Sequence, residues 1–188
     1  MRKVVLLVFI IGGFVMVGAT QVWAQEVYID NFNTGSKPNA LGGDSGVFDF
    51  QPTDFSQCCV DIYDSAEKHG DSGFSMRLNY DVDSADPAYN GYWSKLNGFD
   101  TTGHTKLVLW VKGDTTVFKI ELKNNEGEKG EYYITGVTAD WKKVEVPLEN
   151  FEGLTNLSSL SEFVVVFEDR IASRKEGTIW IDDIYFSD

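Results

Sequence analysis

Two histidines, His69 and His104, are the side chains best suited to acid–base chemistry near neutral pH, and each lies beside a glycine. Neither has a serine or cysteine partner in a recognisable nucleophile motif, and the sequence contains no HExxH or GxSxG. The 29 Asp and Glu residues leave a glycosidase acid pair open on composition alone. Because most of these acids lie in predicted turns or on solvated strand faces, we expect a protein that is not an enzyme.

Carboxylates near the two ends of the chain are candidate calcium ligands. Hard oxygen ligands suit Ca²⁺, and the sequence has no EF-hand loop, so the ligands would be scattered along the chain. Asp30 lies on the first predicted strand and Asp183 on the last, and these two strands often lie close together in a sandwich. We expect these two acids to hold a structural Ca²⁺ with help from backbone carbonyls. Acids in the segment 81–86 are a second candidate, and solvated turn acids are the alternative reading of both places.

Aromatic rings interleaved with polar side chains indicate sugar binding, because rings pack on the apolar faces of sugars while polar groups bind hydroxyls. The chain has five Trp, eight Tyr and 13 Phe. We expect Trp110 and Trp180 in the core, since both lie inside apolar strands. Neighbouring side chains of a strand point to opposite faces, so only one of Tyr92 and Trp93 faces the core. The predicted ligand-binding residues are Arg77, Asn79, Tyr89, Tyr92, Trp93, Lys119, Glu121 and Tyr133.

The first 24 residues have the pattern of a secretory signal peptide. Two basic residues precede an apolar run over 4–17, and the triplet Val22-Trp23-Ala24 suits cleavage after Ala24. The run is short for a membrane span of about 20 apolar residues, so we expect no membrane insertion once the signal is removed. This predicts a secreted, periplasmic or cell-surface protein with a single domain over residues 25–188.

The charge balance restricts the partners. The formal net charge is −13, and such an acidic surface repels nucleic acid and anionic membranes. It also favours a neutral glycan over a polyanionic one. The only cysteines, Cys58 and Cys59, are adjacent, so they form no disulfide framework, although a vicinal disulfide stays open.

The segments between these residues are typical of an all-β protein. Short β-branched and aromatic runs alternate with clusters of Gly, Asn, Asp and Ser. Alternation places Phe118, Ile120 and Leu122 on one face of their strand, whereas the segment 163–167 is apolar throughout and is expected to be a central strand covered on both faces. Only the segment 148–160 has a helical pattern. The predicted strands are Glu26–Phe32, Val47–Phe50, Val60–Tyr63, Ser75–Tyr80, Tyr92–Leu96, Lys106–Lys112, Val117–Lys123, Glu131–Val137, Lys142–Pro147, Phe163–Glu168 and Thr178–Phe186. Such spacing predicts an antiparallel two-sheet jelly-roll sandwich.

The order of several short motifs resembles that of galactose-binding-like carbohydrate-binding modules, in particular family 11 modules and the complex I intermediate-associated 30 kDa-like domains. The motifs are DNF at 30–32, NALGG at 39–43, GFSMRLNY at 73–80, LVLWVKG at 107–113, FKIELK at 118–123, WKKVEVPL at 141–148 and GTIWIDDI at 177–184. The resemblance covers nearly all of residues 25–188. It implies a jelly roll with a concave face for β-glucan-like chains and a structural Ca²⁺ near the termini, with Asp30 and Asp183 as its acids.

Three functions remain open at this point. The first is a non-catalytic protein that binds a polysaccharide or oligosaccharide on one sheet face. The second is a structural or assembly protein that uses the same fold to contact a protein partner. The third, a small glycan lyase or hydrolase, is the least favoured because no catalytic set is present.

Overall fold

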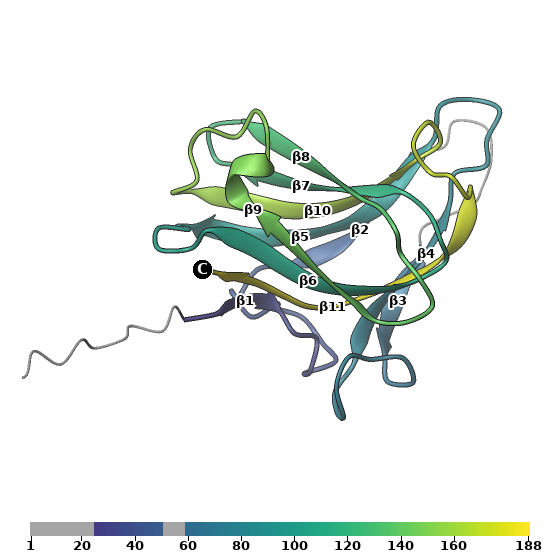
Figure 1. The fold of residues 1–188 in the computed structure, drawn as a ribbon, viewed down its shortest axis with the longest axis horizontal. Coiled ribbons are helices and arrows are strands. Elements are labelled where there is room, and N and C mark those ends of the chain that lie inside the picture. Colours follow the sequence, from purple (N-terminus) through teal and green to yellow (C-terminus); the bar gives the residue numbers. More distant parts are fainter. Residues whose placement is uncertain (1–24, 51–58) are drawn as a thin grey trace, which may run out of the picture.

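A computed structural model describes residues 25–50 and 59–188 of the chain (Figure 1). The predicted signal peptide and Cys58 lie outside the described residues, and nothing is described of the side chain of Cys59. The described part contains eleven strands, one for each strand predicted from the sequence, and a short 3-10 helix. The strands are β1 (Val27–Asp30), β2 (Ser45–Phe50), β3 (Cys59–Asp64), β4 (Ser75–Asp81), β5 (Tyr89–Phe99), β6 (Lys106–Gly113), β7 (Phe118–Asn124), β8 (Lys129–Ile134), β9 (Lys142–Pro147), β10 (Leu160–Glu168) and β11 (Glu176–Ser187).

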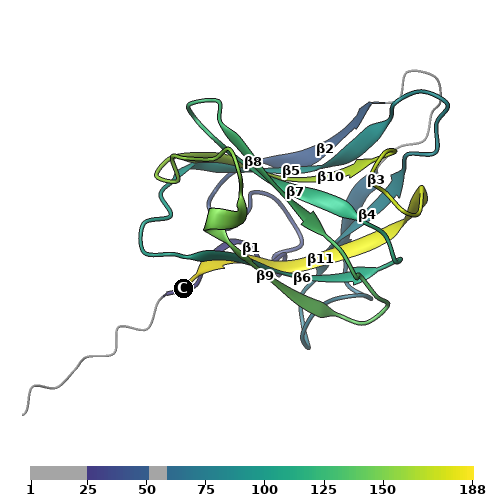
Figure 2. The same ribbon diagram turned by 45° about the horizontal axis from the view of Figure 1, so that its top comes forward.

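The strands form two antiparallel sheets that pack face to face as a jelly-roll sandwich (Figure 2). The five-stranded sheet has the order β2-β5-β10-β7-β8, and the six-stranded sheet has the order β3-β4-β11-β6-β9. In the second sheet, β4 pairs with the first half of β11 and β1 pairs with its second half. The first and last strands are therefore neighbours, as the sequence predicted, and Figure 1 shows the C-terminus beside β1.

The hydrophobic core fills the space between the two sheets. Phe118, Ile120 and Leu122 point inward from β7 and have no exposed surface, which confirms the predicted alternation. Tyr80 of the six-stranded sheet stacks on Phe167 of the five-stranded sheet, with ring centroids 4.3 Å apart. Because each large apolar side chain contributes about 1.5–3 kcal/mol when fully buried, this shared layer holds the sheets together.

The strand over 163–167 lies at the centre of its sheet, between β5 and β7, as predicted, but only one of its faces is covered by the other sheet, because Val164 and Val166 line a hollow on the outer face. The expected helical segment is much shorter than predicted. Only Leu148–Asn150 forms a 3-10 turn, and Gly153 follows with φ of 90°, a left-handed conformation that ends a helix. Among the described residues, no helix is long and apolar enough to cross a membrane.

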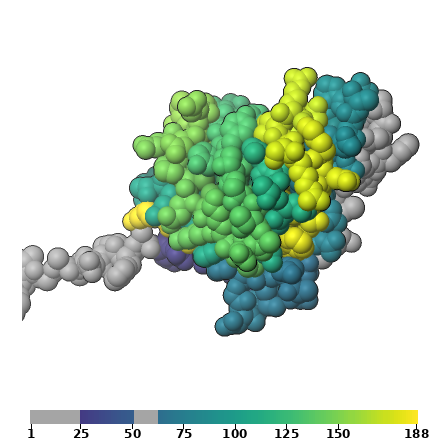
Figure 3. Space-filling view, turned by 45° about the vertical axis from the view of Figure 1, so that its right-hand side comes forward, coloured from purple at the N-terminus to yellow at the C-terminus, as the bar shows by residue number. Residues whose placement is uncertain are grey.

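The connection between β3 and β4 is the most prominent projection of the six-stranded sheet. In the space-filling view it is the blue segment that extends at the bottom of the molecule (Figure 3). It is nevertheless attached to the sheet, because Glu67 forms an ion pair of 2.6 Å with Lys112 and the N–H of His69 donates to Asp182.

Candidate functional site

The outer face of the five-stranded sheet carries a hollow of about 390 Å³, which we call the groove. Its residues come from every strand of that sheet, β2, β5, β10, β7 and β8. They are Phe48, Tyr89, Trp93, Lys119, Glu121, Lys123, Lys129, Glu162, Val164, Val166 and Glu168.

The strand register arranges the groove in rows that run across the sheet. One row leads from Phe48 on β2 over Gly91 and Val166 to Lys119 and Tyr133 on β7 and β8. Side chains opposite one another on paired strands share a face and lie within contact distance, so each row forms one continuous strip of surface.

The next row runs parallel to the first, from Gly46 and Trp93 over Val164 to Glu121 and Glu131. Val164 is only 2 % exposed, although it points away from the core, because the taller side chains around it form the sides of the groove. The two rows together are the floor of a trough that crosses the strands.

The β2–β5 end of the groove is aromatic. A Cβ atom on Gly46 would lie 2.9 Å from the ring of Trp93, and one on Gly91 would lie 2.7 Å from the ring of Phe48. Each ring therefore lies over the glycine of the neighbouring strand, in space that a larger residue would occupy. Further out, Phe50 stacks on Tyr89 with ring centroids 4.9 Å apart. Rings of this kind offer the apolar faces on which sugars pack.

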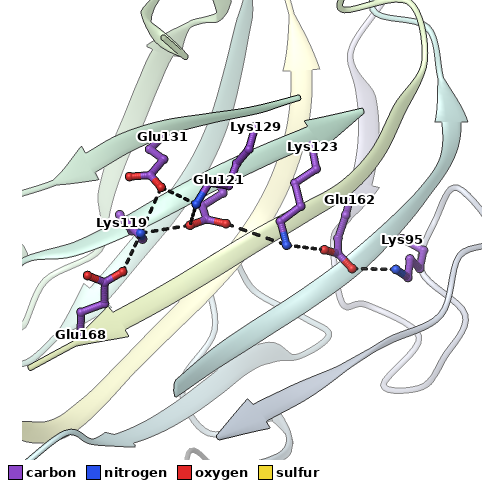
Figure 4. A network of polar contacts seen from close by, with 8 residues as sticks. All are labelled: Lys95, Lys119, Glu121, Lys123, Lys129, Glu131, Glu162 and Glu168. Atoms are coloured by element: carbon purple, nitrogen blue, oxygen red, sulfur yellow. Dashed lines mark hydrogen bonds and ion pairs between the residues drawn. The ribbon is translucent and has the colours of Figure 1, made fainter. Parts of the chain in front are cut away.

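The opposite end is ionic, as Figure 4 shows. Lys119 on β7 is 7 % exposed, and its Nζ lies 3.1 Å from Glu121, 3.2 Å from Glu131 and 2.6 Å from Glu168. Burial would lower the pKa of Lys119, but the hydrogen bonds to the three carboxylates outweigh it and raise the pKa above its usual value. Lys119 therefore stays charged.

A second chain of ion pairs forms one side of the groove. Glu162 on β10 contacts Lys95 on β5 at 2.7 Å and Lys123 on β7 at 2.8 Å, so three strands are linked (Figure 4). Burial would raise the pKa of Glu162, but the hydrogen bonds from both lysines lower it below its usual value. Four lysines and four glutamates thus balance in this network, in a protein whose net charge is −13.

The structure places four of the predicted ligand-binding residues in the groove, namely Tyr89, Trp93, Lys119 and Glu121. Tyr133 lies on the same sheet face but on the edge strand β8, is 49 % exposed and lines a separate hollow with Glu131. It continues the row that begins at Phe48.

Three predicted placements are wrong. Tyr92 points into the core and is 1 % exposed, because Trp93 is the residue of this pair that faces outward. Arg77 and Asn79 point outward as expected, but β4 belongs to the six-stranded sheet, so they lie on the other side of the molecule from Lys119. Arg77 donates from Nε to Asn79 rather than toward the groove.

The remaining described tryptophans gather on the outer side of the six-stranded sheet. Trp110 and Trp180 are half-buried there, which corrects the expectation that both belong to the core. His69 stacks on Trp110 at 3.8 Å, and Nζ of Lys112 lies 5.9 Å from the ring of Trp141 and 5.7 Å from that of Trp180. The groove rings also have partners, since Nζ of Lys95 lies 5.3 Å from the centre of the Trp93 ring, but Phe48, Tyr89 and Trp93 line an open hollow as well.

The two predicted calcium ligands lie on paired strands but have different partners. Asp30 on β1 accepts a hydrogen bond from the N–H of Phe32, and burial raises the pKa of Asp30 to about 6. Asp183 on β11 contacts Nδ1 of His69 at 2.8 Å. Carboxylate oxygens are the kind of donor that Ca²⁺ prefers. Within the described residues no three His, Cys, Asp or Glu side chains gather as a metal site, so backbone carbonyls would have to complete the shell. The calcium stays a prediction.

The jelly roll and a groove of open rings and paired charges together define a carbohydrate-binding module. The family model described as "Carbohydrate binding domain 30" matches residues 60–188. The chain belongs to this family. No match was found among curated proteins.

Solved structures of carbohydrate-binding modules share the fold. The family 11 module of the cellulosomal cellulase Lic26A-Cel5E of Clostridium thermocellum is 20 % identical, with a TM-score of 0.60, over 86 % of this chain and 94 % of that one. A structure of the family 11 module from the same organism in complex with a β-1,3-1,4-mixed-linked tetrasaccharide has the same values. A mutant of the family 29 module CBM29-2 complexed with mannohexaose is 18 % identical, with a TM-score of 0.54, over 88 % of this chain and 93 % of that one.

Sequence reasoning missed the residues that complete the groove. Phe48, Val164 and Val166 look like core residues from their type alone. Glu162 and Glu168 flank the apolar run of β10, so their alternation with Val164 and Val166 was the signal that this face is open.

Proposed function

We propose that this protein is a secreted, non-catalytic module that binds a neutral polysaccharide such as a β-glucan in the groove. The observation that carries the proposal is the Trp93 ring, which lines the groove, lies over Gly46 and has Nζ of Lys95 5.3 Å from its centre. A flat ring next to a row of hydrogen-bonding groups suits a sugar chain, because the ring packs on the C–H face while the charged groups bind hydroxyls.

The charge of the groove supports a neutral ligand. In the part of the chain that the structure describes, the lysines and glutamates of the groove are paired with one another, so no unpaired cation among them attracts an anionic chain. The net charge of −13 opposes polyanions at longer range as well. The β-1,3-1,4-linked tetrasaccharide of the family 11 complex supports a β-glucan as the first ligand to test.

The test is a titration of the protein with mixed-linkage β-1,3-1,4-glucan, mannan and polygalacturonate, read by calorimetry. We expect binding to a neutral glycan and none to polygalacturonate. Trp93→Ala should weaken binding at least tenfold, which corresponds to about 1.4 kcal/mol. Trp141→Ala, which removes the same kind of side chain just before β9 of the opposite sheet, should leave affinity unchanged.

Three results would contradict the proposal or a part of it. Wild-type protein that binds no glycan in the panel would overturn it, and so would equal losses in the two tryptophan variants, because those would point to a general loss of structure. Product release from any of these polysaccharides would contradict the non-catalytic role. For secretion, N-terminal sequencing of exported protein should begin at Gln25.

A further inference from the structure

The ammonium group of Lys119 uses all of its hydrogen-bonding capacity inside the protein. A lysine ammonium has three N–H donors, and here one oxygen each of Glu121, Glu131 and Glu168 lies within 3.2 Å of Nζ. These carboxylates come from three different strands, β7, β8 and β10. No donor is left for a ligand, so Lys119 does not act as the hydroxyl-binding residue that the sequence suggested.

The carboxylates that Lys119 holds keep oxygens free. Each carboxylate has two oxygens, and Lys119 contacts only Oε1 of Glu131 and of Glu168. Within residues 25–50 and 59–188, Oε2 of these two residues has no hydrogen-bond partner, and neither atom is sealed from solvent. Lysine therefore holds these carboxylates in place while their second oxygens stay open, that of Glu168 at the groove and that of Glu131 beside the neighbouring hollow with Tyr133.

We propose that Lys119 is a positioning residue that holds the carboxylates of Glu121, Glu131 and Glu168 in a fixed array, so that their oxygens accept hydrogen bonds from the hydroxyl groups of the ligand. The ligand is then a glycan segment whose hydroxyl groups donate and which carries no carboxylate of its own. This inference rests on the proposed function, and it assigns the ionic half of the site a role separate from stacking.

The positive charge of Lys119 is needed because three carboxylates surround it. Without Lys119, the three carboxylates would share only Lys129, which contacts Glu121 at 3.2 Å and Glu131 at 2.6 Å. Glu168 would lose the only ion pair it makes in the described structure. Carboxylates that crowd without a cation repel one another and take up protons more readily. The charged and titratable groups that face this position are Glu121 and Lys123 on β7, Lys129, Glu131 and Tyr133 on β8, Glu162 and Glu168 on β10, and Tyr89 on β5.

The experiment compares wild type with Lys119→Met and with the double variant Lys119→Met/Glu168→Gln. Binding of a mixed-linkage β-1,3-1,4-glucan oligosaccharide is measured between pH 5 and pH 8, together with urea unfolding at each pH. Wild-type affinity should stay constant within about twofold. Lys119→Met should bind at least tenfold more weakly at pH 7.5 and recover part of this loss at pH 5, where a carboxylate can take up a proton. The double variant, which removes one of the repelling charges, should recover binding at pH 7.5.

The outcomes separate this inference from the proposed function. If Lys119 contacts the sugar directly, Lys119→Met loses affinity equally at every pH and Glu168→Gln restores nothing, which would overturn the inference. If wild type binds no glycan, the proposed function fails, but the unfolding series still decides the role of Lys119. The free energy of unfolding of Lys119→Met should fall further below that of wild type as the pH rises from 5 to 8. A difference that does not grow over this range would contradict the positioning role of Lys119.

Discussion

Gly46 controls how the Trp93 ring lies on the sheet. It sits on the edge strand β2 directly opposite Trp93, and the absent side chain leaves the space that the ring occupies. A tryptophan that stood upright would present an edge to the groove, whereas one that lies over a glycine presents its face. Gly46 thus sets the orientation of the Trp93 ring.

Gly46→Ala is expected to weaken glycan binding without unfolding the protein. The new Cβ would lie 2.9 Å from the indole, so the ring must tilt away from its preferred rotamer at a cost of roughly 1 kcal/mol, or about fivefold in affinity. Val47→Ala, on the same strand but the opposite side, is the matched control and should bind like wild type. Calorimetric titration checks both, and full affinity in Gly46→Ala would show that ring orientation does not matter.

In the turn between β7 and β8, the carboxylate of Glu128 connects two loops by hydrogen bonds. Glu128 accepts hydrogen bonds from the N–H groups of Thr155 and Asn156, at 2.9 Å each, and from the side chain of Asn124 at 2.8 Å. The hydroxyl of Thr155 also donates to Glu128 and is the main cause that lowers the pKa of Glu128 to about 2. The ionised carboxylate therefore ties the β7–β8 turn to the segment before β10.

This lowered pKa predicts a pH dependence of stability. The pKa of Glu128 is lower in the folded protein than the ordinary 4.5, so its contribution is complete above pH 4.5 and is lost as the pH falls toward 2. Glu128→Gln should be less stable than wild type at pH 7, and the difference should shrink between pH 5 and pH 2. Urea unfolding followed by tryptophan fluorescence measures this. Glu152→Gln, with the same change of charge, should differ much less from wild type in its free energy of unfolding. If the difference for Glu128→Gln stays constant between pH 5 and pH 2, the ionised Glu128 carboxylate does not stabilise the two loops.

Within a single strand, the sequence was sufficient where only one face is apolar, because strand signals are local. Alternation in β7 separated Ile120 from Lys119 and Glu121, and both sides were predicted correctly. In β5 aromatics occupy both faces, so Tyr92 and Trp93 could not be told apart by type. Their neighbours carried the missing signal, because Trp93 shares a face with Lys95, and a lysine at that position favours solvent.

For the whole molecule, the sequence failed where strands from distant parts of the chain come together. The outward faces of β4 and β7 have the same polar pattern, but nothing local states which sheet each strand joins. Arg77 was therefore grouped with Lys119 although they lie on opposite sides of the sandwich. The ionic network was missed for the same reason, since the link from Glu168 to Lys119 exists only through the pairing of β10 with β7.

The pairing of β1 with β11 closes the sandwich by joining the two ends of the domain, and it is where a cation would stabilise the whole fold. Asp30 is buried on β1, and Asp183 lies on β11 at a backbone irregularity with φ of 45°. A cation that binds only the folded protein stabilises it by RT ln(1 + [L]/Kd), about 2.7 kcal/mol at a hundredfold excess over Kd. We therefore expect the melting temperature to rise with Ca²⁺ and to fall when a chelator removes it.

The matched variants make this prediction specific to the paired termini. Asp30→Asn and Asp183→Asn should each abolish or weaken the response of the melting temperature to Ca²⁺, because each removes a charged ligand from one of the two strands. Asp140→Asn, in the exposed segment before β9, should keep the full response. Mg²⁺ should act more weakly than Ca²⁺, since it requires a smaller and more regular oxygen shell. A melting temperature that is the same in Ca²⁺ and in chelator would rule out a structural calcium, and the β1–β11 pair would then be held by its backbone hydrogen bonds and core contacts.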